Sequence, residues 1–497
     1  MTPALTISPL IALILVPVVS AAFIIAGAPA RKTAVGASVL NVLVFLLLLS
    51  RFHSAQEGYQ MVSSFPVLPQ WGIAFTLGAD GLAMAMLGLS VVVTWAAVAV
   101  ARTPDRLPGC FYASLLLISA GVIGAFASVD AFFFYMFHEL ALIPTFLLIG
   151  IWGTGDRQAA AWKITIYLAL GSFVLLLGLI GLYLSMPVGA RSFDMREMAD
   201  LSAAGVLAPH DGVFLLLFFG FGILVSLFPF HTWAPRAYAS APSPATMLHA
   251  GVLKKFGLYG MLRLLAPVFP EYVVARWSWL LLILLSANIL YAGFATISQK
   301  KLDMMLGYSS VMHMGYGFLG ILAWNTLGFH GTAYLMISHG LTIAALFALA
   351  GELRARTGTL DFAEMGGLAR PMPAFGLLFG MATFAAVGLP GFAGFVSELL
   401  VFFGAALAGA GTQQSSLWNL YVIATIIAVW GVVMTAVYML RAYRKIFWGE
   451  GNARLASIPE IGTLPRIAIT VLLVLLLLAG LWPPGLLNFL SPALPVP

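Results

Sequence analysis

The chain has 497 residues, of which 61% are hydrophobic and only 8% charged, whereas a soluble globular protein carries roughly 25% charged residues. The net charge of +6 does not indicate nucleic-acid binding, because the basic residues are scattered singly or in pairs. The single cysteine, Cys110, excludes an internal disulfide, an iron–sulfur cluster and a cysteine-rich zinc site. The sequence also lacks a dinucleotide-binding glycine motif and a Walker loop. Any redox or nucleotide chemistry is therefore expected on another subunit.

Apolar runs of about 20 residues, the length that crosses a bilayer as a helix, recur along the whole chain. We predict an all-α polytopic membrane protein with about 14 transmembrane helices. The predicted spans are 6–27, 34–50, 79–100, 111–128, 130–151, 162–185, 212–230, 245–266, 278–297, 304–324, 329–351, 372–409, 418–442 and 464–483.

Two of these spans are predicted to be broken helices. The span 372–409 is too long for one crossing and contains Gly388-Leu389-Pro390-Gly391, and the span 212–230 runs into a proline-rich stretch. The two breaks lie in the seventh and twelfth spans, five spans apart, which indicates two inverted repeats. We divide the chain into an N-terminal three-helix segment, two five-helix repeats, and a C-terminal loop with the last helix, at 1–110, 111–266, 278–442 and 443–497.

Lysine and arginine are distributed unevenly between alternate loops. The loops after odd-numbered spans hold sixteen of these residues, and the loops after even-numbered spans hold five. Because basic loops tend to stay in the cytoplasm, both termini are predicted to lie outside.

Five lysine and glutamate side chains lie deep inside the apolar spans: Glu139, Lys163, Lys254, Lys255 and Glu398. A charged side chain at the bilayer centre costs about 2.5–3.5 kcal/mol on insertion scales, so such residues face the protein interior, pair with one another or line an ion path. We therefore predict that the protein moves a proton or another cation across a membrane.

Glu139 and Lys255 lie near the middle of their spans. A buried carboxyl group can be neutral or paired with a lysine, and switching between these states is a proton-relay step. The alternative for Glu139 is a carboxyl group that only binds a neighbouring helix. Lys255 is too far from either end of its span to reach water easily, and burial disfavours the charged form of a lysine, which can then release its proton.

The other three charged residues differ in where they lie within their spans. Lys254 points about 100° away from Lys255 around an α-helix, so at most one of the two faces the same path. Glu398 follows the break at Pro390 by two turns, where unwound backbone admits water. Lys163 lies nearer a helix end, and snorkelling to the interface is an equal alternative for it.

Histidines add possible stepping groups for protons. His313 and His339 fall within the tenth and eleventh spans, between the central lysine and the distal glutamate. A satisfied structural histidine is an equal alternative for each, and His249 and His138 are further candidates. No cluster of histidines and carboxylates has the spacing of metal ligands, so no metal is expected.

Short motifs between about residue 71 and residue 450 point to one family. They are Leu77-Gly78-Ala79-Asp80-Gly81-Leu82, Phe137-His138-Glu139, Pro229-Phe230-His231-Thr232-Trp233-Ala234-Pro235, Ala241-Pro242, Ala250-Gly251 with Lys255, Tyr308-Ser309-Ser310-Val311-Met312-His313-Met314-Gly315, and Gly391-Phe392-Ala393-Gly394-Phe395-Val396-Ser397-Glu398. Together they resemble the antiporter-like membrane subunits of respiratory complex I, most closely the M-type chain, the bacterial counterpart of mitochondrial subunit four.

This resemblance implies fourteen helices with two inverted five-helix repeats, as the hydropathy also indicates. It implies no cofactor in this chain, with NADH, FMN, iron–sulfur clusters and quinone on partner subunits. It also implies other membrane subunits on both flanks, a lipid bilayer around them and a bacterial inner membrane. The residues at the implied proton-path positions, with the neighbouring second lysine, are Glu139, Lys163, Lys254, Lys255, His313, His339 and Glu398.

The chain departs from the family pattern in four places, one of which is Lys301-Leu302-Asp303-Met304, where the family has Asp-x-Lys-Arg before the Tyr-Ser-Ser motif. The family's helix-seven lysine, which pairs with the helix-five glutamate, falls on Leu224, and the seventh span contains no lysine. Lys254 is an extra charge, and His138 replaces a usual tryptophan. Without the helix-seven lysine, we predict that Glu139 pairs with Lys163 or Lys254.

Three functions fit these observations. The first is a proton-translocating subunit of an NADH–quinone oxidoreductase, a translocase whose electron transfer takes place on other subunits. The second is the corresponding subunit of a multisubunit cation/proton antiporter or a membrane-bound hydrogenase. The third is a structural spacer that has lost pumping, which the missing lysine favours and the retained charges oppose.

Overall fold

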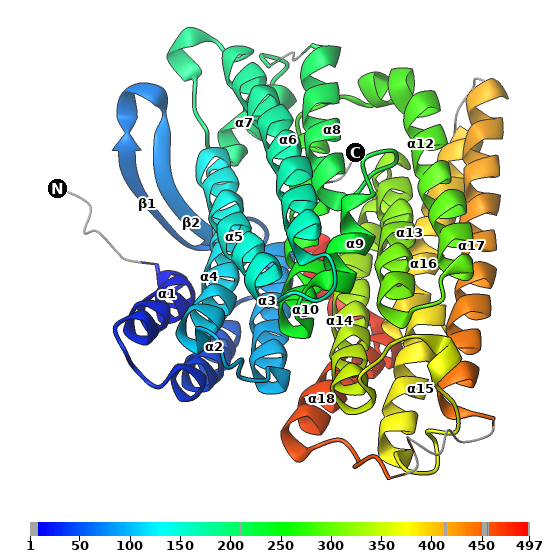
Figure 1. Cartoon of the computed structure of the whole chain (residues 1–497). Helices are drawn as coiled ribbons and strands as arrows, with labels where there is room; N and C mark the ends of the chain where they lie inside the picture. Colours follow the sequence, from blue (N-terminus) through cyan, green and yellow to red (C-terminus); the bar gives the residue numbers. More distant parts are fainter. Residues whose placement is uncertain (1–7, 208–209, 412–414, 450–454, 456, 496–497) are drawn as a thin grey trace.

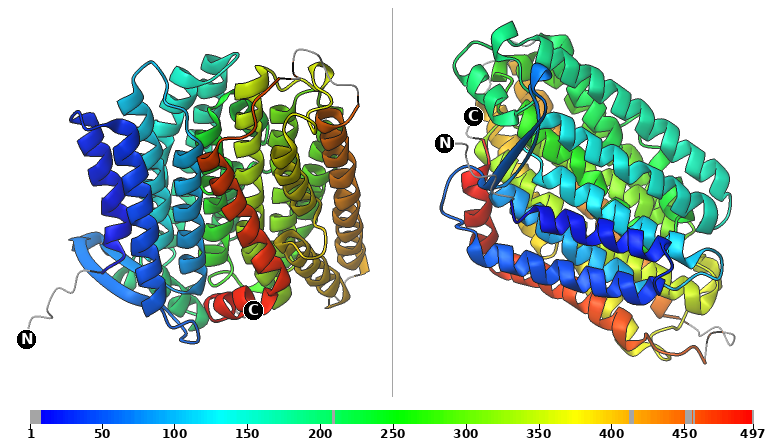
Figure 2. Two further views of the ribbon diagram at one scale, coloured as in Figure 1. Left: turned by 90° about the horizontal axis from the view of Figure 1, so that it is seen from below. Right: turned by 90° about the vertical axis from the view of Figure 1, so that its left-hand side faces the viewer.

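The computed structural model describes residues 8–207, 210–411, 415–449, 455 and 457–495. Within these residues ten helices are long and apolar enough to cross a membrane, and three shorter apolar helices accompany them. The helices form an elongated bundle with α1 and α2 at one end and α17 at the other (Figures 1 and 2). The predicted polytopic helical membrane architecture is confirmed at this level.

Most of the helices follow one another with short connections, and longer ones separate α2 from α3 and α17 from α18. The first eight are α1 (Ile11–Ile25), α2 (Ala30–Arg51), α3 (Gly81–Val100), α4 (Pro108–Ala127), α5 (Ala131–Trp152), α6 (Arg157–Leu184), α7 (Met195–Ala203) and α8 (Asp211–Val225). The rest are α9 (Trp233–Ser240), α10 (Ser243–Gly251), α11 (Phe256–Gly260), α12 (Glu271–Ser298), α13 (Leu302–Leu322), α14 (Thr326–Thr357), α15 (Pro373–Val387), α16 (Ala393–Gly411), α17 (Ser415–Phe447), α18 (Thr463–Leu481) and α19 (Pro483–Leu490).

One segment differs from the predicted all-α fold. Strands β1 (Gln60–Leu68) and β2 (Ile73–Ala79) form an antiparallel hairpin between α2 and α3 (Figure 1). The hairpin turns at Gly72, whose backbone has a positive φ of 63° and where a Cβ would lie 2.5 Å from a backbone oxygen. A search for apolar runs of about 20 residues misses such strands because they are much shorter.

Helix α14 is the centre of the bundle. It packs against α3, α10, α13, α16 and α18, and its apolar stretch is wholly buried, whereas only 33% of the apolar stretches of α2 and α17 is buried. Gly251 at the end of α10 and Gly340 of α14 bring the two backbones into contact, since a Cβ on Gly340 would lie 2.7 Å from the Gly251 carbonyl oxygen. Because α14 meets little lipid, it can carry polar side chains into the membrane region.

The predicted break in the seventh span is confirmed, because α8 and α9 are separated by residues 226–232. Its backbone groups find partners on side chains. Asn288 of α12 donates to the Ser226 carbonyl at 3.3 Å, and the Trp233 indole donates to the Ile223 carbonyl at 3.3 Å. Unpaired backbone groups in a bilayer cost several kcal/mol each, so these side chains allow the helix to open.

The predicted break in the twelfth span is confirmed as well. Helices α15 and α16 are separated by residues 388–392, and Gly388 and Gly391 have positive φ values of 74° and 99°. Glycine adopts this region without the steric cost that a Cβ brings.

A buried ion pair ties α3 to the segment that follows α11. Asp80 caps α3 by accepting from the Ala83 amide at 2.9 Å, and its two carboxylate oxygens also accept from the guanidinium of Arg263. The side chains of Arg263 and Asp80 are 8% and 6% exposed. Because both side chains are buried, the loss of either one would leave a buried charge without its partner.

Replacing Asp80 with alanine is expected to lower the free energy of unfolding by about 3–5 kcal/mol, because a buried guanidinium is left without its partner. The matched control is Asp211→Ala, which removes an ion pair to Arg276, whose side chain is 59% exposed. That change is expected to cost at most about 1 kcal/mol. Thermal denaturation of the purified protein in detergent measures both, and equal shifts would contradict the prediction.

Candidate functional site

The two central lysines lie in an irregular stretch of chain. The span 245–266 was expected to be one helix, and this prediction is wrong. Helix α10 ends at Gly251, Leu253–Lys255 form a 3₁₀ turn, and a π-helical turn covers Met261–Leu265 after α11. Lys255 donates from Nζ to the Ala250 carbonyl, which the end of α10 leaves without a helical partner.

Lys254 and Lys255 are both buried but contact different helices. Nζ of Lys254 donates to the carbonyl and the hydroxyl oxygen of Ser310 in α13, each at 3.2 Å. Nζ of Lys255 lies 2.9 Å from Nδ1 of His339 in α14. The prediction that the two lysines serve different neighbours is confirmed.

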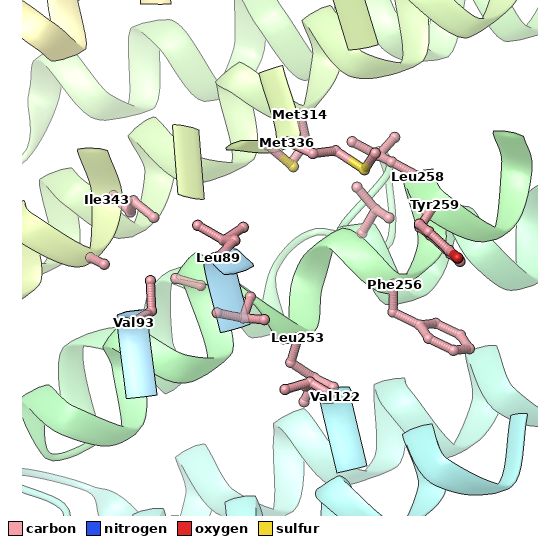
Figure 3. Close-up of a cluster of buried hydrophobic side chains, with 14 of the residues drawn as sticks. Leu89, Val93, Val122, Leu253, Phe256, Leu258, Tyr259, Met314, Met336 and Ile343 are labelled. Atoms are coloured by element: carbon pink, nitrogen blue, oxygen red, sulfur yellow. The ribbon is translucent and has the colours of Figure 1, made fainter. Parts of the chain in front are cut away.

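Apolar side chains enclose the stretch that carries the lysines (Figure 3). They come from α3, α4, α13, α14 and the stretch itself. The labelled side chains include Leu89, Val93, Val122, Leu253, Phe256, Met314, Met336 and Ile343. In such surroundings an uncompensated charge is costly, so the charge state of each lysine depends strongly on its few polar neighbours.

A polar group of side chains extends from Lys255 towards the second helix break. The ring centroids of His339 and His313 are 5.5 Å apart, and both histidines line a small cavity together with Glu398. This cavity has a volume of about 20 Å³, which is room for about one water. The structure thus brings four of the predicted residues together, while their roles stay predictions.

Each of the two histidines has a polar contact at Nδ1. Nδ1 of His313 lies 2.8 Å from the Ser309 carbonyl, and Nδ1 of His339 meets Lys255. Among the described residues, Nε2 of His339 is buried without a hydrogen-bond partner. A buried polar atom of this kind needs an explanation, and a bridging water or a proton-transfer role supplies one.

Glu398 is buried against the backbone of the break between α15 and α16. A Cβ placed on Gly388 would lie 2.6 Å from Oε2 of Glu398. The carboxylate therefore occupies space that only a glycine at position 388 leaves open.

Glu139 lies at the other side of the group, on α5. Its carboxylate is 3.3 Å from Nδ1 of His138, and its side chain is 32% exposed. Within the described part of the chain it forms no ion pair with Lys163 or Lys254, so the predicted pairing is wrong. Lys163 instead lies 5.9 Å from the ring centroid of Tyr167. The described ion-pair contact of Glu139 is thus with His138, its neighbour in the chain, and not with a lysine on another helix.

Sequence reasoning missed two residues near the first break. His231 is buried between α8 and α9, and within the described residues neither of its ring nitrogens has a hydrogen-bond partner. The Tyr238 hydroxyl lies 3.2 Å from Nδ1 of His249, and Nζ of Lys254 lies 5.7 Å from the Tyr238 ring centroid. Their positions beside the prolines of the break could have identified both residues, because irregular backbone often lines a site.

Tyr238 also lines a charged depression near the group, a cavity of about 250 Å³. The cavity walls contain an ion pair between Arg354 and Asp303, and Glu352 pairs with Arg356 beside it. The Tyr238 side chain lies between this cavity and Lys254. Within the described residues no group of three or more metal-ligating side chains is placed to hold an ion.

Known proteins match this geometry and this sequence. The profile of the family described as NADH:quinone oxidoreductase/Mrp antiporter, transmembrane region, matches residues 128–428. NADH-quinone oxidoreductase subunit M of Rickettsia felis is 33% identical over 457 residues, which are 92% of this chain and 89% of that protein. The chain belongs to this family. The resemblance carried by the motifs is confirmed.

Solved structures of the family have the same fold. A chain of respiratory complex I from Thermus thermophilus superposes with a TM-score of 0.85 at 30% identity, over 97% of this chain and 98% of that one. A chain of the Mrp complex from Dietzia superposes with a TM-score of 0.83 at 21% identity, over 98% and 96%. At that lower identity the second likeness concerns the fold alone.

Replacing Gly388 with alanine is expected to displace Glu398 and to cost about 1–2 kcal/mol from the positive φ alone. The matched control is Gly36→Ala in α2, where a Cβ meets nothing within 4 Å. Thermal denaturation and proton pumping of the purified complex measure the two effects. A Gly388→Ala protein that is as stable and as active as the Gly36→Ala protein would contradict the prediction.

Proposed function

We propose that this chain is the M-type, proton-translocating membrane subunit of an NADH–quinone oxidoreductase, in which electron transfer takes place on partner subunits. The observation that carries the proposal is the 2.9 Å contact between Lys255 and His339 in the wholly buried centre of the bundle. A lysine and a histidine at this distance can exchange one proton without solvent.

The proposed path continues from this contact to Glu398. Protonated Lys255 gives its proton to Nδ1 of His339, and the imidazolium releases a proton from Nε2. A water in the cavity carries that proton to His313 or to the Glu398 carboxylate, which becomes neutral. Lys255 is then neutral and ready to be protonated again. The low dielectric favours one positive charge at a time in this group, which keeps the steps in sequence.

We further propose that the chain crosses the membrane fourteen times, with inverted repeats at 111–266 and 278–442 between the segments 1–110 and 443–497. The two breaks, five predicted spans apart, support this arrangement. On the proposed topology the basic loops and the 250 Å³ cavity beside Tyr238 face the cytoplasm. The cavity is then an intake route towards Lys254.

Other membrane subunits are proposed to cover part of the surface, within a bacterial inner membrane. Glu139 is one-third exposed on a face of α5 whose neighbours Met136 and Ile143 are 46% and 68% exposed. A charge facing lipid is costly, so a partner subunit suits this face better than lipid. NADH, FMN, iron–sulfur clusters and quinone are expected on such partners.

The antiporter function shares the fold but has less sequence support, since the Mrp chain is 21% identical and the complex I chain 30%. Purification of the intact complex distinguishes the two. Partners that bind NADH and iron–sulfur clusters support the proposal, and small antiporter chains without them contradict it. A spacer without pumping would tolerate replacement of Glu139, Lys255 and Glu398 together without functional loss.

The topology can be tested with the single cysteine. Cys110 is exposed at the start of α4, which the proposed orientation places in the cytoplasm. A membrane-impermeant maleimide should label Cys110 in inverted vesicles and not in intact cells whose outer membrane is permeable. The matched control is Ser54→Cys with Cys110→Ser, in an exposed loop on the opposite side. The reverse labelling of both sites would contradict the orientation.

The proton path can be tested by removing its central charge. Lys255→Met and Glu398→Gln should each slow proton transfer through this subunit by at least about 10²-fold, because the steps occur in series. The measurement is the proton-to-electron ratio of the complex in proteoliposomes. Lys300→Met removes an exposed lysine and should change nothing. Unchanged ratios in the first two variants would refute the path.

A further inference from the structure

The position to which the family resemblance assigns a lysine is apolar here. Leu224 is buried near the end of α8, and its Cδ2 lies 3.0 Å from a Cβ placed on Gly171 of α6. The next residue on α6, Ser172, lies beside the Glu139 carboxylate. Leu224 is thus close to Glu139 in the structure but cannot offer it a charge.

His138 lies where it can act as the charged partner of Glu139. It is buried, whereas Glu139 is partly exposed, and its Nδ1 lies 3.3 Å from the carboxylate. The face of the imidazole stacks on the ring of Phe256, with a centroid distance of 4.2 Å and an interplanar angle of 28°. Phe256 directly follows Lys255. His138 therefore lies between the carboxylate on the bundle surface and the stretch that carries the central lysines.

We propose that His138 is the ionisable partner of Glu139 and the relay residue that connects it with the central lysines, in place of a lysine on α8. A proton held by Glu139 passes to Nδ1 of His138 and forms an imidazolium beside the carboxylate. The imidazolium then releases its second proton towards the lysine side and returns to the neutral state. After this release the pair carries the single negative charge of the Glu139 carboxylate, which the next incoming proton neutralises.

The next group along this route is His249 of α10. It lies within electrostatic range of His138, Lys254 and Lys255. Among the described residues its Nε2 is buried without a hydrogen-bond partner, while its Nδ1 meets the Tyr238 hydroxyl. An unpaired nitrogen placed among three ionisable groups suits the transfer of a proton from His138 to the lysines.

This inference rests on the proposed function, and its test uses the intact complex in proteoliposomes. His138→Gln keeps a polar side chain beside Glu139 but cannot be protonated, and His138→Phe keeps the ring on Phe256. Both are expected to lose as much of the proton-to-electron ratio as Lys255→Met loses. His53→Gln, at an exposed position outside the spans, is the matched control and is expected to pump as the unchanged complex does.

A rescue experiment separates the relay role from a packing role. Leu224→Lys is expected to restore part of the lost pumping when it is combined with His138→Gln, because it returns a charge to the neighbourhood of Glu139. A packing defect at position 138 would not respond to a lysine on another helix. Should one His138 variant fail to assemble, the other variant carries the test.

The outcomes are distinct. Pumping that is lost in both His138 variants and partly regained with Leu224→Lys supports the inference. Normal pumping in either assembled His138 variant, while Lys255→Met is defective, overturns it and leaves the proposed function standing. A loss that Leu224→Lys does not relieve also overturns it. Normal pumping in Lys255→Met refutes the proposed function itself.

Discussion

The interior of a bilayer offers no water to a charge or to an unpaired backbone group, and this constraint explains the arrangement of the polar groups described above. Polar groups can survive there only where the protein supplies their partners. Asn288 and Trp233 do so for the first helix break, and the turn around Gly388 makes room for Glu398 at the second. The wholly buried α14 supplies a partner for Lys255. Polar side chains thus pair the backbone groups of the first break, and the second break leaves the space that Glu398 occupies.

The sequence predicted the features that local chemistry determines. Prolines and glycines located the two breaks, and the apolar runs located the helices, because backbone restrictions and bilayer thickness act on short stretches of chain. The hairpin at residues 60–79 was missed because a strand is much shorter than a span. The irregular stretch 252–265 was missed because it contains no internal proline to mark it, only Gly257 and Gly260.

The structure brings Lys255, His339, His313 and Glu398 together, but their individual contacts were not predictable from the sequence. Buried charge identifies Lys255 and Glu398 wherever they lie in a span, whereas partners depend on which helices meet. The pairing of Glu139 was predicted wrongly because adjacent residues on a helix point about 100° apart, so a chain neighbour is an unexpected partner. The bond between Asp80 and Arg263 joins residues far apart in sequence, and only the packing of α3 beside the irregular stretch reveals it.

The glycine contact between α10 and α14 has a mechanical consequence. With Gly251 and Gly340 touching through their backbones, no layer of flexible side chains separates the two helices. A displacement of α14 towards α10 therefore meets backbone rather than adaptable side chains, and it moves the chain that leads to Lys255. The same helix holds Ser338 against Ser397, one residue before Glu398. Helix α14 therefore joins the chain before Lys255 directly to the helix that carries Glu398.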